Sequence, residues 1–398
     1  MLVLMRVHRI LAETSAQLLK LVFRERRVLD MELSKTFHKN PKFGKRDRAF
    51  IAETVYEVAR WRRALAFVAD SDEIRAMCAA QWLRMGYEVP SWWSYHGADV
   101  VMMGSRQVDL RDQIRPIRES VPDWLDDKLC EEIGEDLWSR ELSALNQRAP
   151  VYLRINPLKG DSDEVIDWLT SEGVDVEPIS GVPGALRLAE GRVISKQLLA
   201  DGRIEIQDAG SQCIVPLLGA EPGERVIDAC SGAGGKALQL AAVMSNEGRI
   251  YAMDVDERKL AELKQRARRA GARNIVIKPI TDTTAADFFE VADRLLIDAP
   301  CSGLGTLKRQ PDLKWRLRPA TIERARVIQR QLLLEYSKML KPGGRLVYAT
   351  CSILPSENWH VVETLLETGG FNLIEERKLS PSVDGFDGFY AAALKKRG

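Results

Sequence analysis

Residues Arg225–Lys236 read RVIDACSGAGGK, a short apolar run followed by a glycine-rich turn. The apolar run predicts a strand over Arg225–Ala229, and the apolar spacing after the turn predicts a helix over Lys236–Met244. Glycines at 232, 234 and 235 let the backbone adopt positive φ and approach a ligand closely. The stretch is therefore typical of a strand–turn–helix unit that cradles a nucleotide-like cofactor.

Strands and helices continue to alternate on the carboxyl side of this unit. We expect strands over Arg249–Met253, Asn274–Ile280, Arg294–Ile297 and Arg345–Ala349, and helices over Glu257–Ala270 and Pro319–Leu340. Such alternation predicts an α/β fold with a parallel, doubly wound sheet. Ligands of these sheets bind beyond the carboxyl ends of the strands, so that edge is where a site is expected.

Two further parts precede the alternating region. Residues 1–145 are predicted to be mostly helical, with a basic loop over His38–Arg48 and an irregular stretch of helix and loop over Ser71–Val108. Short strands and one helix, Asp161–Glu172, predict a small α+β unit between them. We therefore expect three domains, over residues 1–145, 146–210 and 211–398.

The composition is that of an ordinary globular protein, because 45% of the 398 residues are hydrophobic and 29% are charged. The net charge is only +1, but it is unevenly distributed. Residues 1–63 carry fifteen Lys/Arg and seven Asp/Glu. A basic amino-terminal region suits the phosphates of a nucleic acid, although a solvated helix surface explains the charge equally well.

Six cysteines are scattered along the chain without a C-x-x-C pair, and four histidines form no ligand pattern. Neither a disulfide framework nor a metal site is expected from this usage. No run of about 18 apolar residues occurs, so we expect no membrane span. Charges at Arg6, Arg9, Glu13 and Lys20 argue against a signal peptide, and a reducing, cytoplasmic location fits best.

Two of the cysteines lie in short motifs at predicted strand ends, namely Asp298-Ala-Pro-Cys301 and Thr350-Cys351-Ser352. A single cysteine is more often a small buried apolar residue than a nucleophile, but two at neighbouring strand ends favour chemistry. Asp254 ends the strand after the glycine turn, about 20 residues on, where a carboxylate can accept ribose hydroxyls. The turn lacks the G-x-G-x-x-G and Walker patterns, which favours S-adenosylmethionine over NAD or ATP.

These residues suit methylation of a cytosine on carbon. C5 of cytosine is a poor nucleophile, and addition of a thiolate at C6 makes C5 enamine-like, so that C5 can attack a sulfonium methyl group. A second acid/base group then assists release of the thiolate. Asp298 can hydrogen-bond the exocyclic amine and the N3 edge of the base. The residues alone leave open which of Cys301 and Cys351 attacks.

The motifs resemble the RNA 5-methylcytosine methyltransferases of the Nol/Nop/Sun group, and the bacterial 16S rRNA methyltransferase B-like subgroup most closely. Beyond the two cysteine motifs, the resemblance is carried by Asp298–Arg316, Glu357-Asn358, Gln207–Ser211, Arg154–Lys159, Asp387–Tyr390, Arg46–Ala49, Val55–Val58 and Arg60. It implies a Rossmann-like class I methyltransferase sheet, a small RNA-recognition-like subdomain and a helical, NusB-like RNA-binding domain. The turn departs from the group at Ser231-Gly232-Ala233, where Ala-Ala-Pro is usual.

The resemblance also implies roles for individual residues. Cys351 would be the nucleophile, Cys301 would assist release, and Asp298 would complete the catalytic set. The cofactor and base pocket would be lined by Cys230, Ser231, Gly232, Ala233, Gly234, Gly235, Lys236, Asp254, Asp282 and Asp298. The expected partners are S-adenosylmethionine and RNA, in particular small-subunit ribosomal RNA, and we expect a monomer without metal or membrane partners.

Two other functions compete with this one. A DNA cytosine-5 methyltransferase would attack with Cys301, the cysteine of the Pro-Cys pair, but the Thr-Cys-Ser motif and the flanking modules count against it. A non-catalytic RNA-binding assembly factor could keep the same fold. The presence of Cys301, Cys351 and Asp298 together argues against that alternative.

Overall fold

The computed structural model describes residues 5–189 and 194–398. The chain forms two compact units, one of Met1–Gln147 with Leu307–Pro319 and one of Arg148–Thr306 with Ala320–Gly398. Leu307–Pro319 thus groups with the amino-terminal helices, although the sequence places it within residues 211–398. The division into three functional domains stays a prediction.

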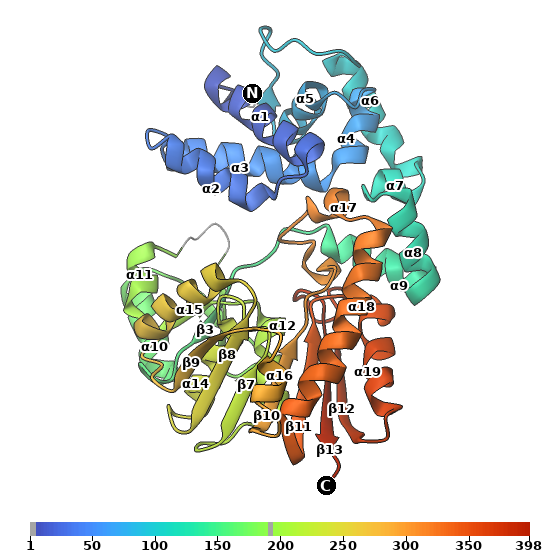
Figure 1. The fold of residues 1–398 in the computed structure, drawn as a ribbon. Helices are drawn as coiled ribbons and strands as arrows, with labels where there is room; N and C mark the ends of the chain where they lie inside the picture. Colours follow the sequence, from blue (N-terminus) through green and yellow to red (C-terminus); the bar gives the residue numbers. More distant parts are fainter. Residues whose placement is uncertain (1–4, 190–193) are drawn as a thin grey trace. The chain divides into compact units, whose positions relative to one another are not determined.

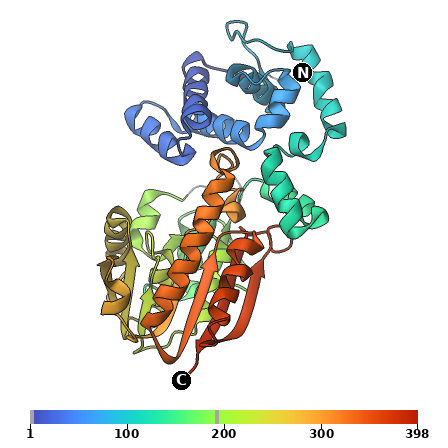
Figure 2. The ribbon, with the colours of Figure 1, turned by 45° about the vertical axis from the view of Figure 1, so that its right-hand side comes forward.

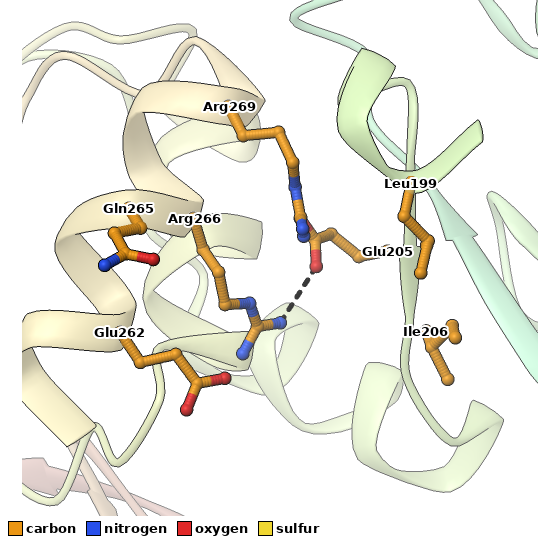
Figure 3. Close-up of a pocket in the computed structure, with 7 residues that line it drawn as sticks. All are labelled: Leu199, Glu205, Ile206, Glu262, Gln265, Arg266 and Arg269. Carbon is orange, nitrogen blue, oxygen red and sulfur yellow. Dashed lines mark hydrogen bonds and ion pairs between the residues drawn. The ribbon is translucent and has the colours of Figure 1, made fainter. Parts of the chain in front are cut away.

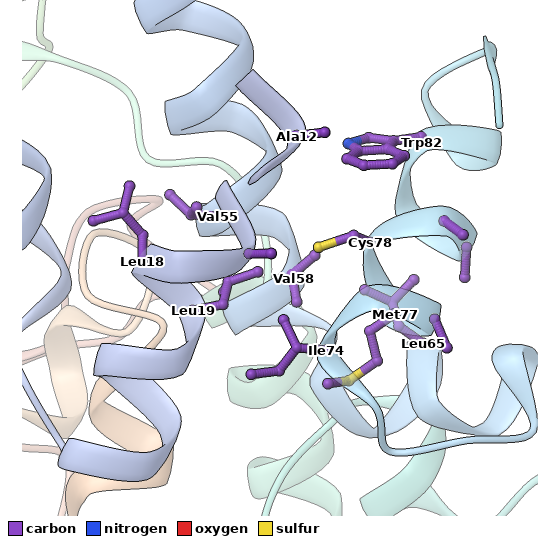
Figure 4. Close-up of a cluster of buried hydrophobic side chains, with 14 of the residues drawn as sticks. Ala12, Leu18, Leu19, Val55, Val58, Leu65, Ile74, Met77, Cys78 and Trp82 are labelled. Carbon is purple, nitrogen blue, oxygen red and sulfur yellow. The ribbon is translucent and has the colours of Figure 1, made fainter. Parts of the chain in front are cut away.

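The first unit is built mainly from helices. They are α1 Arg9–Glu25, α2 Leu29–Lys39, α3 Lys45–Arg60, α4 Arg62–Ala69, α5 Ile74–Arg84, α6 Val100–Asp109, α7 Arg115–Arg118, α8 Asp123–Ile133, α9 Glu135–Leu145 and α17 Leu313–Arg316. The apolar faces of α1–α6 meet in one core, where Leu19, Val55, Val58, Cys78 and Trp82 are almost fully buried (Figure 4). A parallel pair of two-residue strands, β1 Met5–Arg6 and β2 Tyr87–Glu88, was not expected.

The basic segment His38–Arg48 is mostly helical, so the expected loop is wrong at both ends. Helix α2 continues to Lys39, and α3 begins at Lys45. The backbone N–H of Gly44 donates to Oδ2 of Asp47 at 2.9 Å, which stabilises the first turn of α3 and explains its early start. Lys42, Lys45 and Arg46 are exposed on this segment.

The segment Ser71–Val108 is more regular than expected, because α5 and most of α6 lie within it. Trp82 and Trp93 are buried in the helical core, with ring centroids 4.9 Å apart. Trp92 is 37% exposed. Two of these three tryptophans therefore serve packing.

The second unit begins with a four-stranded antiparallel sheet in the order β4-β5-β3-β6. Its strands are β3 Tyr152–Ile155, β4 Val176–Pro178, β5 Ala185–Leu188 and β6 Ile204–Ile206, and its helices are α10 Ser162–Ser171 and α11 Lys196–Asp201. Asp161 caps α10, since its Oδ1 accepts from the Glu164 N–H at 2.9 Å. Leu169 and Leu186 help to form a small core under this sheet.

A seven-stranded sheet in the order β12-β13-β11-β10-β7-β8-β9 forms the rest of this unit (Figure 1). The strands are β7 Arg225–Asp228, β8 Arg249–Asp254, β9 Ile275–Pro279, β10 Ala292–Asp298, β11 Leu340–Thr350, β12 Phe371–Leu379 and β13 Phe389–Lys396. The expected Rossmann-like sheet is confirmed. However, β13 runs antiparallel to both neighbours, so the prediction that the whole sheet is parallel is wrong. The short connection from β12 to β13 allows a hairpin, whereas a parallel neighbour would need a long crossover.

Helices cover both faces of the large sheet. They are α12 Ala209–Gln212, α13 Ile214–Leu218, α14 Gly235–Val243, α15 Glu257–Ala270, α16 Thr284–Asp287, α18 Pro319–Tyr336 and α19 Trp359–Leu366. Val226 faces the core shared with α13 and α14, and its neighbour Ile227 faces the core shared with α18 and α19. Figure 2 shows α18 in orange running along the strands beside α19 in red.

The expected helix Pro319–Leu340 ends earlier, at Tyr336, and a single 3₁₀ turn follows. Strand β11 starts at Leu340 rather than Arg345, because Leu340 already pairs with Ala292 of β10. The register then shifts to the pair Arg294–Arg345, so the Lys-Pro-Gly-Gly stretch lies within the strand as an irregularity. Among the described residues, no helix combines the length and apolar character that a bilayer crossing requires.

Lys314 of α17 lies in the interior of the helical unit, only 1% exposed. Its Nζ donates to the Arg60 carbonyl at 2.9 Å and to Oδ1 of Asn146 at 3.0 Å. Burial, followed by the nearby Arg60 charge, lowers the pKa of Lys314 to about 7. Leu307–Pro319 is therefore attached to these helices through a lysine whose charged form is disfavoured.

We expect this lysine to make the chain more stable as pH rises from 7 towards 10. Between its folded and unfolded pKa values the unfolded chain binds the extra proton, so raising pH favours folding by at most about 1.4 kcal/mol per pH unit. The measurement is denaturant unfolding of wild type and Lys314→Met at pH 7, 8 and 9. The free energy of unfolding of wild type should increase relative to that of Lys314→Met as pH rises. A difference that does not change with pH would contradict a lowered pKa for Lys314.

Candidate active site

The carboxyl ends of β7, β8, β10 and β11 meet at one edge of the large sheet. Asp228, Asp254, Asp298 and Thr350 are the last residues of these four strands. The strand order changes direction between β7 and β10, which opens a crevice at this edge in open α/β sheets. Most of the residues proposed from the sequence therefore lie in one place.

The glycine turn after β7 is held against the end of β8. The Gly232 N–H donates to Oδ2 of Asp254 at 2.8 Å, and the Asp256 N–H donates to Oδ1 at 2.8 Å. Gly234 has φ +87°, and a Cβ there would lie 2.0 Å from Cδ1 of Leu263, so only glycine fits. Each carboxylate oxygen of Asp254 accepts one bond here and keeps capacity for a ligand hydroxyl.

Asp228 lies directly beneath this turn and is fully buried. Neither carboxylate oxygen has a hydrogen-bond partner among the described residues. Burial, and then the nearby Asp298 charge, raise the pKa of Asp228 to about 7, although the Lys236 charge and the Cys230 amide act in the opposite direction. An unpaired buried acceptor beside a glycine turn fits a ligand that carries an amino group, and S-adenosylmethionine carries one.

Lys236 and Asp298 form an ion pair across the crevice. Nζ of Lys236 lies 2.5 Å from Oδ2 of Asp298, and the lysine is 7% exposed. Burial acts to lower the pKa of Lys236, but the Asp298 carboxylate outweighs it and leaves that pKa above its usual value. Asp298 is thereby oriented with one oxygen committed to the lysine.

The two motif cysteines come together. Sγ of Cys301 and Sγ of Cys351 are 3.4 Å apart, although 50 residues separate them in sequence. The hydrogen bond with Cys351, together with burial, raises the pKa of Cys301 well above its usual value. Cys301 is therefore held as a thiol, with its sulfur in hydrogen-bond contact with that of Cys351.

Backbone contacts set the spacing of these two turns. The Ala299 N–H donates to the Ala349 carbonyl at 2.8 Å, and the Gly305 N–H donates to the Cys351 carbonyl at 2.9 Å. A Cβ at Gly305 would lie 2.0 Å from the Gly388 carbonyl oxygen, so this position also requires glycine. The Asp387-Gly388 segment quoted from the sequence thus packs directly against the cysteine turns.

Two further residues of the expected site, Cys230 and Asp282, differ from the rest in how their side chains are placed. The side chain of Cys230 packs against the apolar cluster beneath the sheet, and burial raises the pKa of its thiol. Cys230 therefore contributes its backbone to the turn rather than a reactive sulfur. Asp282 is exposed between β9 and α16, and no hydrogen bond joins it to the turn or to Asp254 in the part of the chain that the structure describes.

Several residues of the site were not singled out from the sequence. Asp228 and Glu357 stand within quoted motifs but received no role, and Gln329 and Arg266 lie on helices without any local signal. Their placement depends on partners far along the chain, such as the Ala233 carbonyl for Arg266 at 2.7 Å.

A pocket of about 540 Å³ lies between residues of the small sheet and helix α15 (Figure 3). Its lining residues come from α11, β6 and α15 and are Leu199, Glu205, Ile206, Glu262, Gln265, Arg266 and Arg269. Glu205 accepts from Arg266 at 2.9 Å and from Arg269 at 2.5 Å. Because Arg266 also donates to the Ala233 carbonyl, it connects the small sheet to the turn.

Comparison with known proteins adds the following findings. The family model for the 16S rRNA methyltransferase RsmB/F matches residues 215–395, and a ferredoxin-like domain of RsmF/B-like methyltransferases matches residues 121–195. A probable ribosomal RNA small subunit methyltransferase B of Synechocystis is 35% identical over 303 residues, which are 70% of this chain and 67% of that protein.

Two further similarities cover comparable lengths. A Bacillus subtilis protein described in the same words is 30% identical over 312 residues, 73% of this chain and 70% of that protein. The crystal structure of a methyltransferase homolog from Pyrococcus horikoshii matches with a TM-score of 0.64 and 28% identity, over 72% of this chain and 99% of that chain.

We expect Arg266→Met to weaken binding of S-adenosylmethionine about tenfold, since a hydrogen bond from a charged donor is worth roughly 1.5–3 kcal/mol. The measurement is calorimetric titration with the cofactor. Arg269→Met is the matched control, because Arg269 contacts Glu205 but has no hydrogen bond to the turn. Equal weakening in both variants would contradict a specific role for the Arg266–Ala233 contact.

Proposed function

The chain belongs to the RsmB/F family of 16S rRNA methyltransferases, and on that premise we propose that it methylates carbon 5 of a cytosine in small-subunit ribosomal RNA. The observation that carries the proposal is the 3.4 Å separation of the Cys301 and Cys351 sulfurs at the carboxyl edge of the sheet. Two thiols this close can serve as nucleophile and proton-transfer group on one base.

Cys351 is the nucleophile in this proposal. Its sulfur lies 3.4 Å from the sulfur of Cys301, within reach of a hydrogen bond from that thiol. The thiolate adds to C6 of the cytosine, and the electrons of the C5–C6 double bond make C5 nucleophilic. The base must leave its helical stack for C6 to be reached, so single-stranded or flipped cytosine is the expected substrate.

S-adenosylmethionine, the cofactor of the family, supplies an electrophilic methyl group when bound. The turn at Gly232 and Gly234 offers close backbone approach, and Asp254 retains acceptor capacity for hydroxyls. Asp228 offers the unpaired buried carboxylate to an amino group. The Arg266 contact holds the turn from the opposite side.

Cys301 assists the final step. After methylation, C5 loses its proton to a base, the electrons of the C–H bond restore the double bond, and the bond from C6 to sulfur breaks. Cys351 leaves as a thiolate, and the adjacent Cys301 thiol stabilises it by donating a hydrogen bond. Asp298, oriented by Lys236, accepts from the exocyclic amine of the cytosine and holds the ring in place.

The helical unit and the small sheet would bind the RNA. The exposed basic side chains Lys42, Lys45 and Arg46 at the start of α3 suit phosphates, which supply the salt-dependent part of binding. We propose that residues 1–145 act as a NusB-like RNA-binding domain and residues 146–210 as an RNA-recognition-like subdomain. The methyltransferase domain proper would then be residues 211–398.

We expect Cys351→Ala to lower methyl transfer by on the order of a thousandfold or more, because the nucleophile is removed. Cys301→Ala should instead accumulate a protein–RNA adduct that survives denaturing electrophoresis. The assay uses labelled S-adenosylmethionine and undermethylated small-subunit ribosomal RNA.

Cys213→Ala is the control, since this thiol is buried in the apolar core. Transfer that survives Cys351→Ala but not Cys301→Ala would make Cys301 the nucleophile, as in the DNA-type mechanism. Absence of transfer from wild type on this RNA would contradict the proposed substrate.

We expect Lys42, Lys45 and Arg46 changed together to Glu to weaken RNA binding and to reduce its dependence on salt. The slope of log K against log salt should fall by about 0.7–0.9 for every phosphate that the variant no longer neutralises. A triple variant of exposed lysines on the second unit, Lys264, Lys278 and Lys395 to Glu, changes the net charge equally. If the two variants respond alike across a salt series, the binding surface is not at the start of α3.

A further inference from the structure

Glu357 is a fully buried carboxylate next to the cysteine turns. It ends the 3₁₀ turn Pro355–Glu357, and its side chain is 0% exposed. An ionised carboxylate in the interior is expensive unless hydrogen bonds replace its hydration, by several kcal/mol in real proteins. The partners that stabilise this one are therefore informative.

Four donors converge on the carboxylate. Oε1 accepts from the Ser302 N–H at 2.8 Å and from Nε2 of Gln329 at 3.1 Å. Oε2 accepts from the Ser302 and Ser352 hydroxyls, at 2.5 Å each. All four contacts have Glu357 as the acceptor, which is the arrangement that a carboxylate provides.

Three of these four donors, all except Nε2 of Gln329, belong to the two segments that carry the thiols. Ser302 directly follows Cys301, and Ser352 directly follows Cys351. Their hydroxyl oxygens lie 3.2 Å apart on the shared Oε2. One carboxylate thus joins the turn that carries Cys301 to the turn that carries Cys351. The sulfurs of these two cysteines are 3.4 Å apart.

Gln329 extends this connection to helix α18. Its amide donates to Glu357 and also to the Pro300 carbonyl at 2.9 Å, immediately before Cys301. The backbone of Glu357 is held as well, because the Tyr348 hydroxyl donates to its carbonyl at 2.7 Å. The Glu357 carboxylate therefore contacts both cysteine turns and helix α18. A substitution that removes one of its oxygens alters the hydrogen bonds that hold both turns.

We propose that Glu357 is a positioning residue for the reaction, whose buried carboxylate keeps the Cys301 and Cys351 turns at the spacing that attack and release both require. The inference rests on the proposed function, in which both thiols act on one base. A misplacement of about 1 Å in such an arrangement can cost a hundredfold in rate. Within the part of the chain that the structure describes, the Glu357 carboxylate is hydrogen-bonded to the serines that follow the two cysteines and not to the sulfurs, so it acts through those serines.

The negative charge of Glu357 has a second effect on Cys301. After the Cys351 hydrogen bond and burial, it is among the causes that raise the pKa of the Cys301 thiol. Glu357 thereby helps to keep Cys301 protonated, as the release step needs, while it sets the position of that thiol.

The test is Glu357→Gln in the full-length chain. The amide is nearly the same size, but only one of its two terminal atoms accepts hydrogen bonds, so two of the four donors lose their acceptor in either orientation of the amide. We expect kcat for methyl transfer to fall about ten- to hundredfold. The affinity for S-adenosylmethionine should stay within about twofold, and the protein–RNA adduct should accumulate as in Cys301→Ala. Glu357→Asp keeps the charge and should restore part of the rate.

Tyr348→Phe is the matched control, because it removes a hydrogen bond to the backbone of the same residue and leaves the carboxylate contacts intact. It should release methylated product without accumulating the adduct. Equal loss of rate in Tyr348→Phe and Glu357→Gln would show general loosening and overturn the inference.

Cys301→Ala and Cys351→Ala are measured in parallel. If they behave as proposed while Glu357→Gln matches wild type, the positioning role is wrong and the two-thiol function stands. If neither cysteine variant alters transfer, the proposed function itself fails. Should Glu357→Gln not fold, Ser302→Ala and Ser352→Ala remove the hydroxyls singly, and wild-type rates without adduct in both would overturn the inference.

Discussion

The close approach of two chain segments at the end of the sheet is the constraint on which the rest of the site depends. Strands β10 and β11 are neighbours and parallel, so their carboxyl ends emerge side by side. The segments that follow must stay together after the ladder has ended, and there the hydrogen bonds of the sheet no longer help. Backbone contacts at Ala299 and Gly305 and the Glu357 carboxylate replace them.

This constraint explains which residues are tolerated nearby. Gly305 lies so close to Gly388 that any side chain at residue 305 would displace the segment before β13. Buried hydroxyls at Ser302 and Ser352 would be unfavourable alone, and they are satisfied by the same buried carboxylate that needs donors. The two serine hydroxyls and the Glu357 carboxylate therefore satisfy one another. Removing one of these groups leaves its partners with an unmade hydrogen bond in the interior.

The opposite side of the crevice is organised differently. The glycine turn is positioned by the end of β8, through the Gly232 N–H on Asp254, and by α15, through Arg266 on the Ala233 carbonyl. Asp228 is left buried and unpaired beneath it, at an energetic cost that a bound ligand can offset. The polar groups around the cysteine turns are thus hydrogen-bonded to one another. Around the glycine turn, the carboxylates of Asp228 and Asp254 keep acceptor capacity.

The sequence by itself determined the fold class, the glycine turn and the identity of the two thiols, because these follow from local patterns of apolar spacing, glycine and strand ends. It predicted β7, α14 and α15 within about one residue at each end. It did not predict the antiparallel β13, since strand direction depends on how chain segments pair. Only the tertiary structure decided that Cys301 lies 3.4 Å from Cys351, that Glu357 joins their turns, and that Leu307–Pro319 groups with the amino-terminal helices. The Cys301–Cys351 and Ser302–Glu357 contacts join residues 50 and 55 positions apart, and a helix residue such as Gln329 carries no local sign of the carboxylate that it contacts.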